Sequence, residues 1–338
     1  MSEATTTPPG IDLEKVGAFL DKPGLQAELI SGGRSNLTYR IWNDEGEWVL
    51  RRPPLGHVLP TAHDMAREYR VLSALRDTPV PVPKTVVLCE DNDVNGAPFY
   101  VMEMVHGLIV RGEPPKGYAD GPGDRAGMAE ALIDVLVAIH AVDYKAVGLD
   151  GFGRPEGYLE RQVGRWAKQW EGNKTRELPE IEELHRLLRE RLPSQSDSTI
   201  VHGDYRLDNT MLAPDDPGRI LAVLDWEMST LGDPLADLGL LMVYWRDADD
   251  RSGRPGLGGV NGFPSRKEVV ARYSAKSGRS VDDLGFHTAL GYYKLAIITE
   301  GIHASFLKGQ TVGEGFGGIG AGVPMLVNAG LNALTSPN

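Results

Sequence analysis

The sequence predicts an α+β fold with two lobes, and three observations support that prediction. The chain has 338 residues, a length typical of two domains or lobes with a sizeable core. Its first third contains short β-rich segments, whereas helical patterns dominate the remainder. Two strand-and-loop pieces then occur in residues 199–239, where they enclose the polar side chains of a candidate site.

The first part of the chain combines strands with two helices. Residues 1–10 are polar and Pro-rich, so we expect a loose tail. Residues 63–75 predict a helix, because Met65, Tyr69 and Leu72 recur at spacings of three and four. A short helix is also expected at 12–20, and strands are expected at 27–30, 37–42, 47–52, 85–89 and 99–107.

Amphipathic helices dominate the rest of the chain. Residues 124–140 place Ala129, Leu132 and Leu136 on one apolar stripe, which is typical of a core helix. Further helices are expected at 158–170, 181–191, 238–245, 265–276, 281–298, 300–307 and 324–334. Loops rich in Gly, Pro or charged residues are expected at 111–123, 247–262 and 309–322.

Composition and charge disfavour several classes of protein. Hydrophobic residues make up 41% and charged residues 24% of the chain, as in an ordinary soluble globular protein. The net charge is −12 and the sequence pI is near 5.2, which disfavours a protein that binds nucleic acid or an anionic membrane. No apolar run approaches the roughly 18–20 residues that cross a bilayer.

Cysteine usage and the N-terminal sequence predict a cytoplasmic protein. Cys89 is the single cysteine, which excludes an intramolecular disulfide and a Cys-based zinc site. The first ten residues lack the basic and apolar regions of a secretory signal.

The candidate site combines three polar side chains. Asp204 and Asn209 lie five residues apart on a loop after an apolar pair, and Asp225 ends an apolar run at 220–224. The turn at 214–218 predicts a hairpin that places Asp225 beside Asn209, with Asp204 a few ångströms further on. One carboxylate would orient a hydroxyl, while the amide and the second carboxylate would hold Mg²⁺. The alternative is a hairpin with solvated acids, since Asp and Asn are common in turns.

This segment resembles the catalytic segment of the aminoglycoside phosphotransferase and choline kinase superfamily, which is related to the protein kinases. The resemblance rests on HGDYRLDN at 202–209, followed after sixteen residues by Asp225 in LDWE, and on GDPLADL at 232–238. It implies that Asp204 is the catalytic base and that Asn209 and Asp225 bind Mg²⁺.

The resemblance covers roughly residues 29–240 and implies a bilobal protein-kinase-like fold. Residues 1–105 would form a nucleotide-binding N-lobe, an antiparallel sheet with one helix. Residues 106–338 would form a mainly helical C-lobe with the catalytic loop and the acceptor-binding helices. Gly32 and Gly33 lie in a turn between strands, where backbone N–H groups can approach phosphates. Taken alone, the same pair is a common hairpin turn.

The resemblance also implies a nucleotide site. Arg51 aligns where protein kinases carry a phosphate-binding Lys, and Glu68 on the next helix is its expected partner. The alternatives are solvated strand-end arginines and a solvated Glu68. The end of the strand expected at 99–107 would form the hinge between the lobes. There the Glu103 carbonyl and the Val105 N–H would bind adenine, with Met102 at the back of the pocket.

Three further polar residues lie in or near the loop. Arg206 is expected to reach the γ-phosphate, and its alternative is a salt bridge to Asp208 or another local carboxylate. His202 is expected to pack and hydrogen-bond within the loop rather than to transfer protons. Asp237 is interpreted as a C-lobe anchor for that loop.

The implied activity is Mg²⁺-dependent transfer of a γ-phosphate from ATP, or alternatively GTP, to a hydroxyl of a small molecule. The VLRRPP segment at 49–54 and the HGDYRLDN and LDWE motifs look most like the branch of this superfamily whose members are fused to, or found with, acyl-CoA dehydrogenases. That similarity suggests a hydroxyacyl acceptor as readily as an aminoglycoside. No nucleic-acid or membrane partner is expected, and the oligomeric state is left open.

Two other functions remain open at this stage. The first is a pseudokinase that binds nucleotide in a regulatory or scaffolding role, supported by Arg51 in place of Lys. The second is a protein kinase, which is disfavoured because the sequence lacks the H-R-D and A-P-E motifs.

Overall fold

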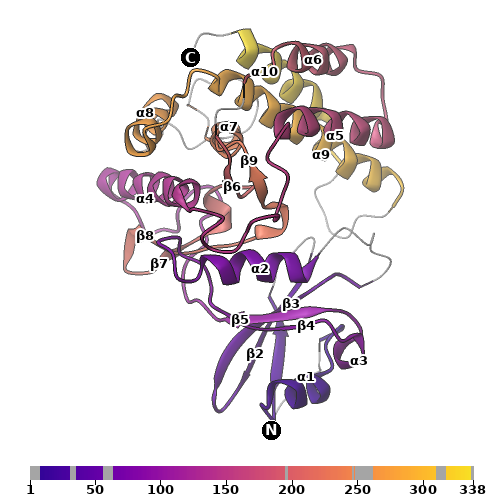
Figure 1. The fold of residues 1–338 in the computed structure, drawn as a ribbon, viewed down its shortest axis with the longest axis vertical. Coiled ribbons are helices and arrows are strands. Elements are labelled where there is room, and N and C mark those ends of the chain that lie inside the picture. The colour runs from indigo at the N-terminus through magenta and orange to yellow at the C-terminus, as the bar shows by residue number, and fades with distance from the viewer. Residues whose placement is uncertain are drawn as a thin grey trace.

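A computed structural model of the chain has a bilobal, kinase-like α+β fold, as predicted (Figure 1). It describes residues 8–30, 36–55, 64–194, 197–245, 247, 262–309 and 317–335. Gly32 and Gly33, most of the expected tail at 1–10 and most of the expected loop at 247–262 lie outside the described residues, as does part of the loop at 309–322. The N-lobe carries the larger sheet, and the C-lobe carries most of the helices (Figure 1).

The N-lobe sheet has five antiparallel strands in the order β1-β2-β3-β5-β4. The strands are β1 (Gln26–Leu29), β2 (Leu37–Asn43), β3 (Gly46–Arg52), β4 (Thr85–Cys89) and β5 (Phe99–Glu103). Helix α2 (Met65–Leu75) begins at Asp64, whose side chain accepts a hydrogen bond from the Arg67 N–H. The lobe also contains the expected helix α1 (Leu13–Leu20) and a four-residue helix, α3 (Asn92–Asn95). The boundary expected at residue 105 follows β5 and stays a prediction.

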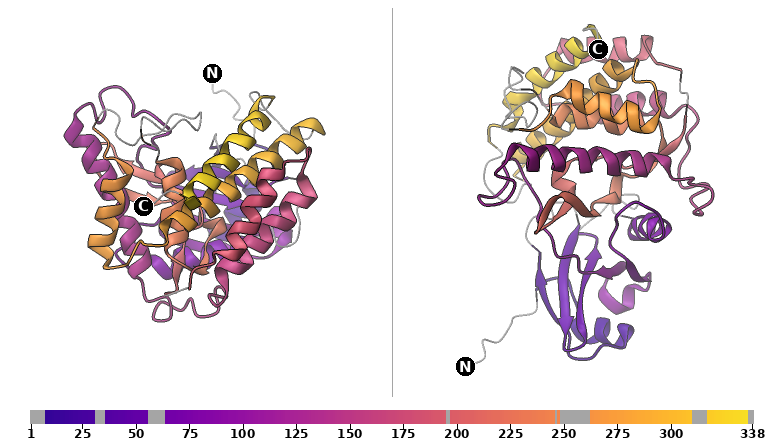
Figure 2. Two further views of the ribbon diagram at one scale, coloured as in Figure 1. Left: turned by 90° about the horizontal axis from the view of Figure 1, so that it is seen from above. Right: turned by 90° about the vertical axis from the view of Figure 1, so that its left-hand side faces the viewer.

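Alternation along the strands gives the sheet two buried faces. Tyr39, Ile41 and Leu50 pack with α1 on one face, where the Phe19 and Phe99 rings meet edge to face at 5.8 Å. On the opposite face, side chains of β3 and β5 join the cluster that contains the apolar side of α2. Figure 2 shows α2 beside the sheet, between it and the C-lobe. Consecutive residues of β3 therefore point to different environments, which separates Arg51 from Arg52.

The C-lobe is built on helices and two small sheets. Its helices are α4 (Pro122–Ala141), α5 (Tyr158–Asn173), α6 (Pro179–Glu190), α7 (Leu235–Tyr244), α8 (Arg266–Ser277), α9 (Leu284–Leu307) and α10 (Val323–Thr335). The strand pairs are β6 (Thr199–Val201) with β9 (Thr230–Gly232), and β7 (Thr210–Ala213) with β8 (Asp216–Val223). The 3₁₀ turns are η1 (Leu207–Asn209), η2 (Trp226–Met228) and η3 (Ile319–Gly322). In the described residues, no helix is both long and apolar enough to cross a membrane.

One expected helix boundary is wrong. The sequence predicts separate helices at 281–298 and 300–307, whereas α9 is continuous across this junction. Glu300 is fully buried in the helix, and its carboxylate accepts hydrogen bonds from the Thr175 N–H, the Thr175 hydroxyl and Arg176. Because these partners satisfy the buried charge, the helix continues through Glu300 without a break.

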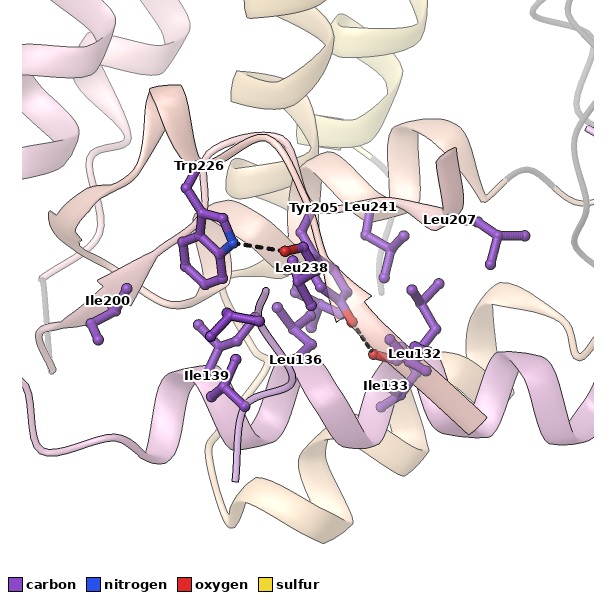
Figure 3. Packing of buried hydrophobic residues seen from close by; sticks show 14 of the residues in the cluster. Leu132, Ile133, Leu136, Ile139, Ile200, Tyr205, Leu207, Trp226, Leu238 and Leu241 are labelled. Atoms are coloured by element: carbon purple, nitrogen blue, oxygen red, sulfur yellow. Dashed lines mark hydrogen bonds between the residues drawn. The ribbon is translucent and has the colours of Figure 1, made fainter. Parts of the chain in front are cut away.

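The apolar stripe of α4 packs beneath the loop at 202–209. Figure 3 shows Leu132, Leu136 and Ile139 of α4 packed close to Tyr205 and Trp226. The buried Tyr205 hydroxyl donates to the Leu132 carbonyl at 2.7 Å. Burying side chains of this size stabilises the fold by roughly 1.5–3 kcal/mol each, so the loop rests on a rigid base.

The β7–β8 hairpin brings the two ends of the candidate site together. Thr210 pairs with Val223, and the Leu224 N–H donates to the Asn209 carbonyl at 2.8 Å. The Val223 N–H also donates to the Pro81 carbonyl at 2.8 Å, which ties the hairpin to the segment before β4. The expected hairpin is therefore confirmed, and it places Asn209 and Asp225 at neighbouring ends of its strands.

Candidate active site

A cleft lies between the N-lobe sheet and the β7–β8 hairpin. One part is apolar and carries the hinge, and the other is polar. The apolar part is lined by Ile30, Val49, Met102, Val105, Ile109, Met211, Val223 and Leu224. Arg51, Glu68 and Asp225 line the polar part. An apolar slot beside a few charged groups is typical of a small-molecule site.

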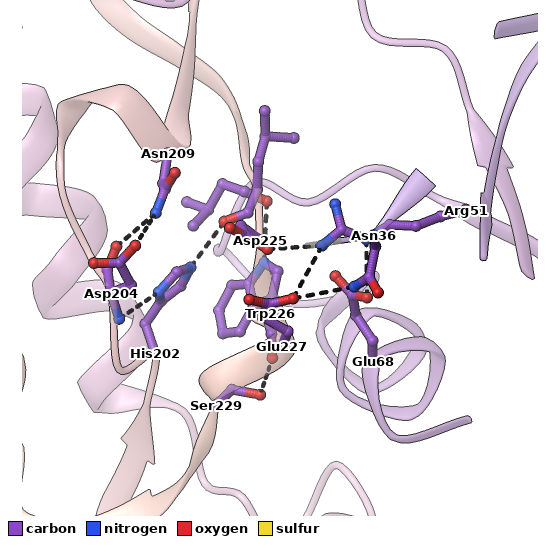
Figure 4. Close-up of polar contacts among 12 residues, drawn as sticks. Asn36, Arg51, Glu68, His202, Asp204, Asn209, Asp225, Trp226, Glu227 and Ser229 are labelled. Carbon is purple, nitrogen blue, oxygen red and sulfur yellow. Dashed lines mark hydrogen bonds and ion pairs between the residues drawn. The ribbon is translucent and has the colours of Figure 1, made fainter. Parts of the chain in front are cut away.

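Asp204 is held in a fixed geometry by its neighbours. The Asn209 side-chain N–H₂ donates to the Asp204 Oδ2 at 2.9 Å and to the Asp204 carbonyl at 2.8 Å (Figure 4). The Asp204 N–H donates to His202 Nδ1 at 3.2 Å, and His202 Nε2 lies 2.9 Å from the Leu224 carbonyl. His202 thus packs and hydrogen-bonds within the loop, as the sequence interpretation expected.

Asp237 anchors the start of the loop from the C-lobe. Its carboxylate accepts the His202 N–H at 2.7 Å and the Gly203 N–H at 2.8 Å, and His140 Nε2 lies 3.3 Å away. Burial alone would raise the pKa of Asp237, but its contacts with His140 and His202 lower it below the ordinary value. Asp237 is therefore a charged anchor, as the sequence indicated.

Asp225 lies between the loop at 202–209 and the N-lobe (Figure 4). Its backbone is left-handed, with φ 64°, a conformation that few non-glycine residues adopt. Its Oδ1 accepts a hydrogen bond from Arg51 Nη2 at 2.7 Å, and Glu227 Oε2 lies 3.7 Å from the same nitrogen. Arg51 therefore bridges carboxylates from both lobes.

Arg51 pairs with Glu68, as predicted. Arg51 Nε lies 3.0 Å from Glu68 Oε2, and Glu68 is almost fully buried. Arg52 points the other way, where its guanidinium donates to the carbonyls of Gly10 and Asn95. Of the two neighbouring arginines, Arg51 is the one that reaches the cleft.

Of the remaining predicted site residues, Arg206 lies on the loop at 202–209, and the other two line the cleft. Glu103 and Val105 line it at the hinge, and the Val105 N–H has no hydrogen-bond partner among the described residues. Arg206 Nη1 lies 3.5 Å from Asp208 Oδ2, its Nε lies 3.7 Å from Asp204 Oδ2, and its guanidinium covers the Tyr244 ring. The contact with Asp208 is the salt bridge that the sequence analysis gave as the alternative role of Arg206. The roles of all these residues stay predictions.

Comparison with known proteins shows the family of this chain. The sequence model of the "Phosphotransferase enzyme family" matches residues 26–270. The chain belongs to that family. The expected resemblance to the aminoglycoside phosphotransferases and to the branch associated with acyl-CoA dehydrogenases is confirmed.

Two relatives in sequence and one solved structure of the same fold illustrate what the chain is similar to. Acyl-CoA dehydrogenase family member 10 of Mus musculus is 38% identical over 287 residues, which are 82% of this chain but 26% of the relative. The chain thus spans about a quarter of that protein. A Ralstonia eutropha protein named "putative aminoglycoside phosphotransferase" is 32% identical, with a TM-score of 0.84 over 97% of this chain and 99% of the other. An aminoglycoside phosphotransferase in a ternary complex with streptomycin and ATP shares the fold, at 15% identity and a TM-score of 0.56 over 86% and 90% of the two chains.

Asn209 and Asp225 offer a donor set that fits Mg²⁺. The Asn209 amide nitrogen donates to Asp204, which leaves its Oδ1 as an acceptor; within the described ranges no group donates to this oxygen. Asp225 uses Oδ1 for Arg51 and has a second carboxylate oxygen. Amide and carboxylate oxygens are the ligands that Mg²⁺ prefers, and phosphates and waters usually complete its shell. The described residues contain no group of three or more His, Cys, Asp or Glu placed to hold a metal by themselves.

Three polar residues near the candidate site were missed by the sequence interpretation. Asn36 Nδ2 donates to Glu227 Oε2 at 3.1 Å, which connects β2's edge to η2. Glu227 lies two residues after Asp225 in the LDWE motif, so its position in the sequence could have indicated that it lies near the site. Lys294 of α9 donates to the Gly203 carbonyl at 2.5 Å, and its place within an apolar helix was the one local hint.

We expect Glu68 to make stability depend on pH. Burial raises the pKa of Glu68 from 4.5 to about 7, because desolvation outweighs the favourable charge of Arg51. Between these two values the folded protein holds a proton that the unfolded chain has lost, so this contribution to the free energy of unfolding falls as pH rises. The melting temperature of the wild type should therefore fall relative to that of Glu68→Gln as the pH rises from 4.5 to 7.

The matched control for this titration is Glu90→Gln, at an exposed position outside the cleft. Its melting temperature should follow that of the wild type at every pH. A difference between wild type and Glu68→Gln that is flat with pH would contradict the raised pKa.

Proposed function

We propose that this chain is a Mg²⁺-dependent small-molecule kinase that transfers the γ-phosphate of ATP to a hydroxyl group. The observation that carries the proposal is the geometry of Asp204. Asn209 holds its carboxylate at 2.9 Å, and the hairpin brings Asp225 to the adjoining side of the cleft (Figure 4). Family membership supports phosphotransfer, and the kinase-like fold supports a nucleotide donor.

The nucleotide would bind with its adenine in the apolar part of the cleft. The hinge offers the Glu103 carbonyl and the Val105 N–H, beside apolar side chains such as Met102. Arg51 would contact the phosphates, because its guanidinium already faces the carboxylates of the polar part. Gly32 and Gly33 would cover the phosphates. Glu68 would orient Arg51 through their ion pair.

The reaction would break the bond between the γ-phosphorus and the oxygen that bridges the β- and γ-phosphates. A new bond forms between that phosphorus and the acceptor oxygen, and ADP leaves with the bridging oxygen. Asp204 accepts a hydrogen bond from the acceptor hydroxyl, aligns it with the phosphorus and takes up its proton. Mg²⁺ held by Asn209 and Asp225 would neutralise the charge on the phosphates. Arg206 would add positive charge near the transferred group.

The acceptor is proposed to be a hydroxylated acyl compound or an aminoglycoside. Relatives named acyl-CoA dehydrogenase family members favour the acyl class, and relatives named aminoglycoside phosphotransferases favour the second. Such a small-molecule reaction fits a cytoplasmic protein with a single buried cysteine.

A transfer assay tests this proposal. Labelled ATP and Mg²⁺ are incubated with separate pools of hydroxyacyl-CoAs, hydroxy acids, amino alcohols and aminoglycosides. We expect Mg²⁺-dependent label in one pool, lost when Mg²⁺ is chelated. Tight binding of Mg·ATP with no label in any pool would favour a nucleotide-binding pseudokinase instead.

A further inference from the structure

Lys294 is a partly buried lysine beside the catalytic loop that the proposed reaction does not use. It lies on α9, and its Nζ donates to the Gly203 carbonyl at 2.5 Å. The Met228 Sδ lies 3.8 Å from the same nitrogen, and the Trp166 ring centroid lies 5.6 Å away. Within the described part of the chain, its oxygen partner is this backbone carbonyl rather than a carboxylate.

The Gly203 carbonyl belongs to the peptide group that leads directly into Asp204. The other end of this peptide, the Asp204 N–H, donates to His202 Nδ1 at 3.2 Å. The preceding N–H, of Gly203, is held by Asp237 Oδ1 at 2.8 Å. Lys294 therefore supplies the contact that fixes the carbonyl side of the peptide, while the two N–H groups are fixed by other side chains.

The local backbone requires such support. Gly203 has φ 84°, a left-handed conformation, and an added Cβ would lie 2.7 Å from the Met228 carbonyl oxygen. Rotation of the Gly203–Asp204 peptide would redirect the Asp204 side chain away from its contact with Asn209. A donor fixed on the long helix α9 opposes that rotation, because α9 packs tightly against α7 and α10.

The charges around Lys294 explain why an ammonium is tolerated here. Burial lowers the pKa of Lys294, and the negative charges of Asp204 and Asp237 partly restore it. Each of these carboxylates acts from a distance, since neither forms an ion pair with Nζ in the described residues. Lys294 is thus placed to hold the loop without occupying the carboxylate that would receive the acceptor.

We propose that Lys294 is a positioning residue for Asp204, acting through the Gly203 carbonyl. This rests on the proposed kinase function. The competing role is a direct contact with the acceptor molecule. The two roles differ in their kinetic effects: a loop-positioning residue changes kcat, whereas an acceptor contact changes the acceptor KM.

The kinetic test uses Lys294→Met, which keeps a long unbranched side chain but removes the donor. We expect kcat to fall roughly ten- to hundredfold, as for a misplaced catalytic group, with KM for ATP and for the acceptor within about twofold of the wild type. Lys294→Arg, which keeps the donors, should recover part of the loss. The matched control is Lys168→Met on the exposed face of α5, which should leave kcat unchanged.

A second readout does not depend on turnover. Amide hydrogen exchange in the peptide covering residues 202–209 should speed up in Lys294→Met, while exchange in the rest of the C-lobe and Mg·ATP affinity stay as in the wild type. Failure of the kinase proposal would abolish transfer in the wild type but would leave this comparison intact.

Three results would overturn the inference. The first is an acceptor KM that rises while kcat is kept, which would assign Lys294 to acceptor binding. The second is unchanged exchange at residues 202–209. The third is faster exchange throughout the C-lobe with no recovery in Lys294→Arg, which would make Lys294 a general packing residue.

Discussion

Replacing Asp204 by Asn is expected to lower kcat for phosphate transfer by about a thousandfold, within the range typical of general-base removal. The amide keeps the size of the carboxylate but cannot take up the proton of the acceptor hydroxyl. Because Asp204 contacts the amide of Asn209 rather than the hinge, ATP should still bind with near wild-type affinity. Initial rates of ADP formation and a direct titration with Mg·ATP measure the two effects separately.

The matched control for this substitution is Asp215→Asn. Asp215 lies at the exposed tip of the β7–β8 hairpin, where it pairs with Arg219. The same chemical change at that position should leave both kcat and ATP affinity unchanged. Retention of more than about a tenth of wild-type kcat by Asp204→Asn would argue against a general-base role.

Above pH 7, where Glu68 is mostly charged, replacing Arg51 by Met is expected to destabilise the protein by about 3 kcal/mol, as when one partner of a buried ion pair is removed. Glu68 would remain buried opposite a methionine, and Asp225 would lose its 2.7 Å contact with the guanidinium. Mg·ATP binding should weaken as well, because the cleft would lose the cation that we propose to contact the phosphates. Denaturant unfolding and nucleotide titration measure these losses.

Two further variants separate the causes. The double variant Arg51→Met/Glu68→Met removes both charges, so it should recover most of the stability but none of the nucleotide affinity. Arg52→Met removes the neighbouring arginine, which bonds carbonyls away from the cleft, and should leave ATP affinity unchanged. Equal loss of ATP affinity in the two single variants would contradict the assignment of Arg51 to the phosphates.

The parts of the fold that were predictable from the sequence depend on local patterns. Strand alternation indicated that only one of Arg51 and Arg52 faces the cleft, and turn residues indicated the β7–β8 hairpin that unites Asn209 with Asp225. The pairing of Arg51 with Glu68 came from the family resemblance, and the 3.0 Å contact supports it.

The parts that were missed depend on partners far away in the sequence. The break expected near residue 299 is absent because Glu300 finds Thr175 and Arg176 on the segment between α5 and α6. Likewise, the contacts of Asn36 with Glu227 and of Lys294 with Gly203 join residues separated by 191 and 91 positions. Local patterns could draw attention to Glu227 and Lys294, but they could not identify the partners, since these contacts form only once the lobes and helices have packed.

Phosphorus NMR of a reaction with the best acceptor tests the central claim most directly. If the chain is a small-molecule kinase, the wild type should produce one phosphomonoester signal for each ADP formed. Asp204→Asn should produce neither signal over the same period. Formation of ADP with inorganic phosphate alone, or unchanged ATP despite saturated binding, would contradict phosphate transfer to a small-molecule hydroxyl.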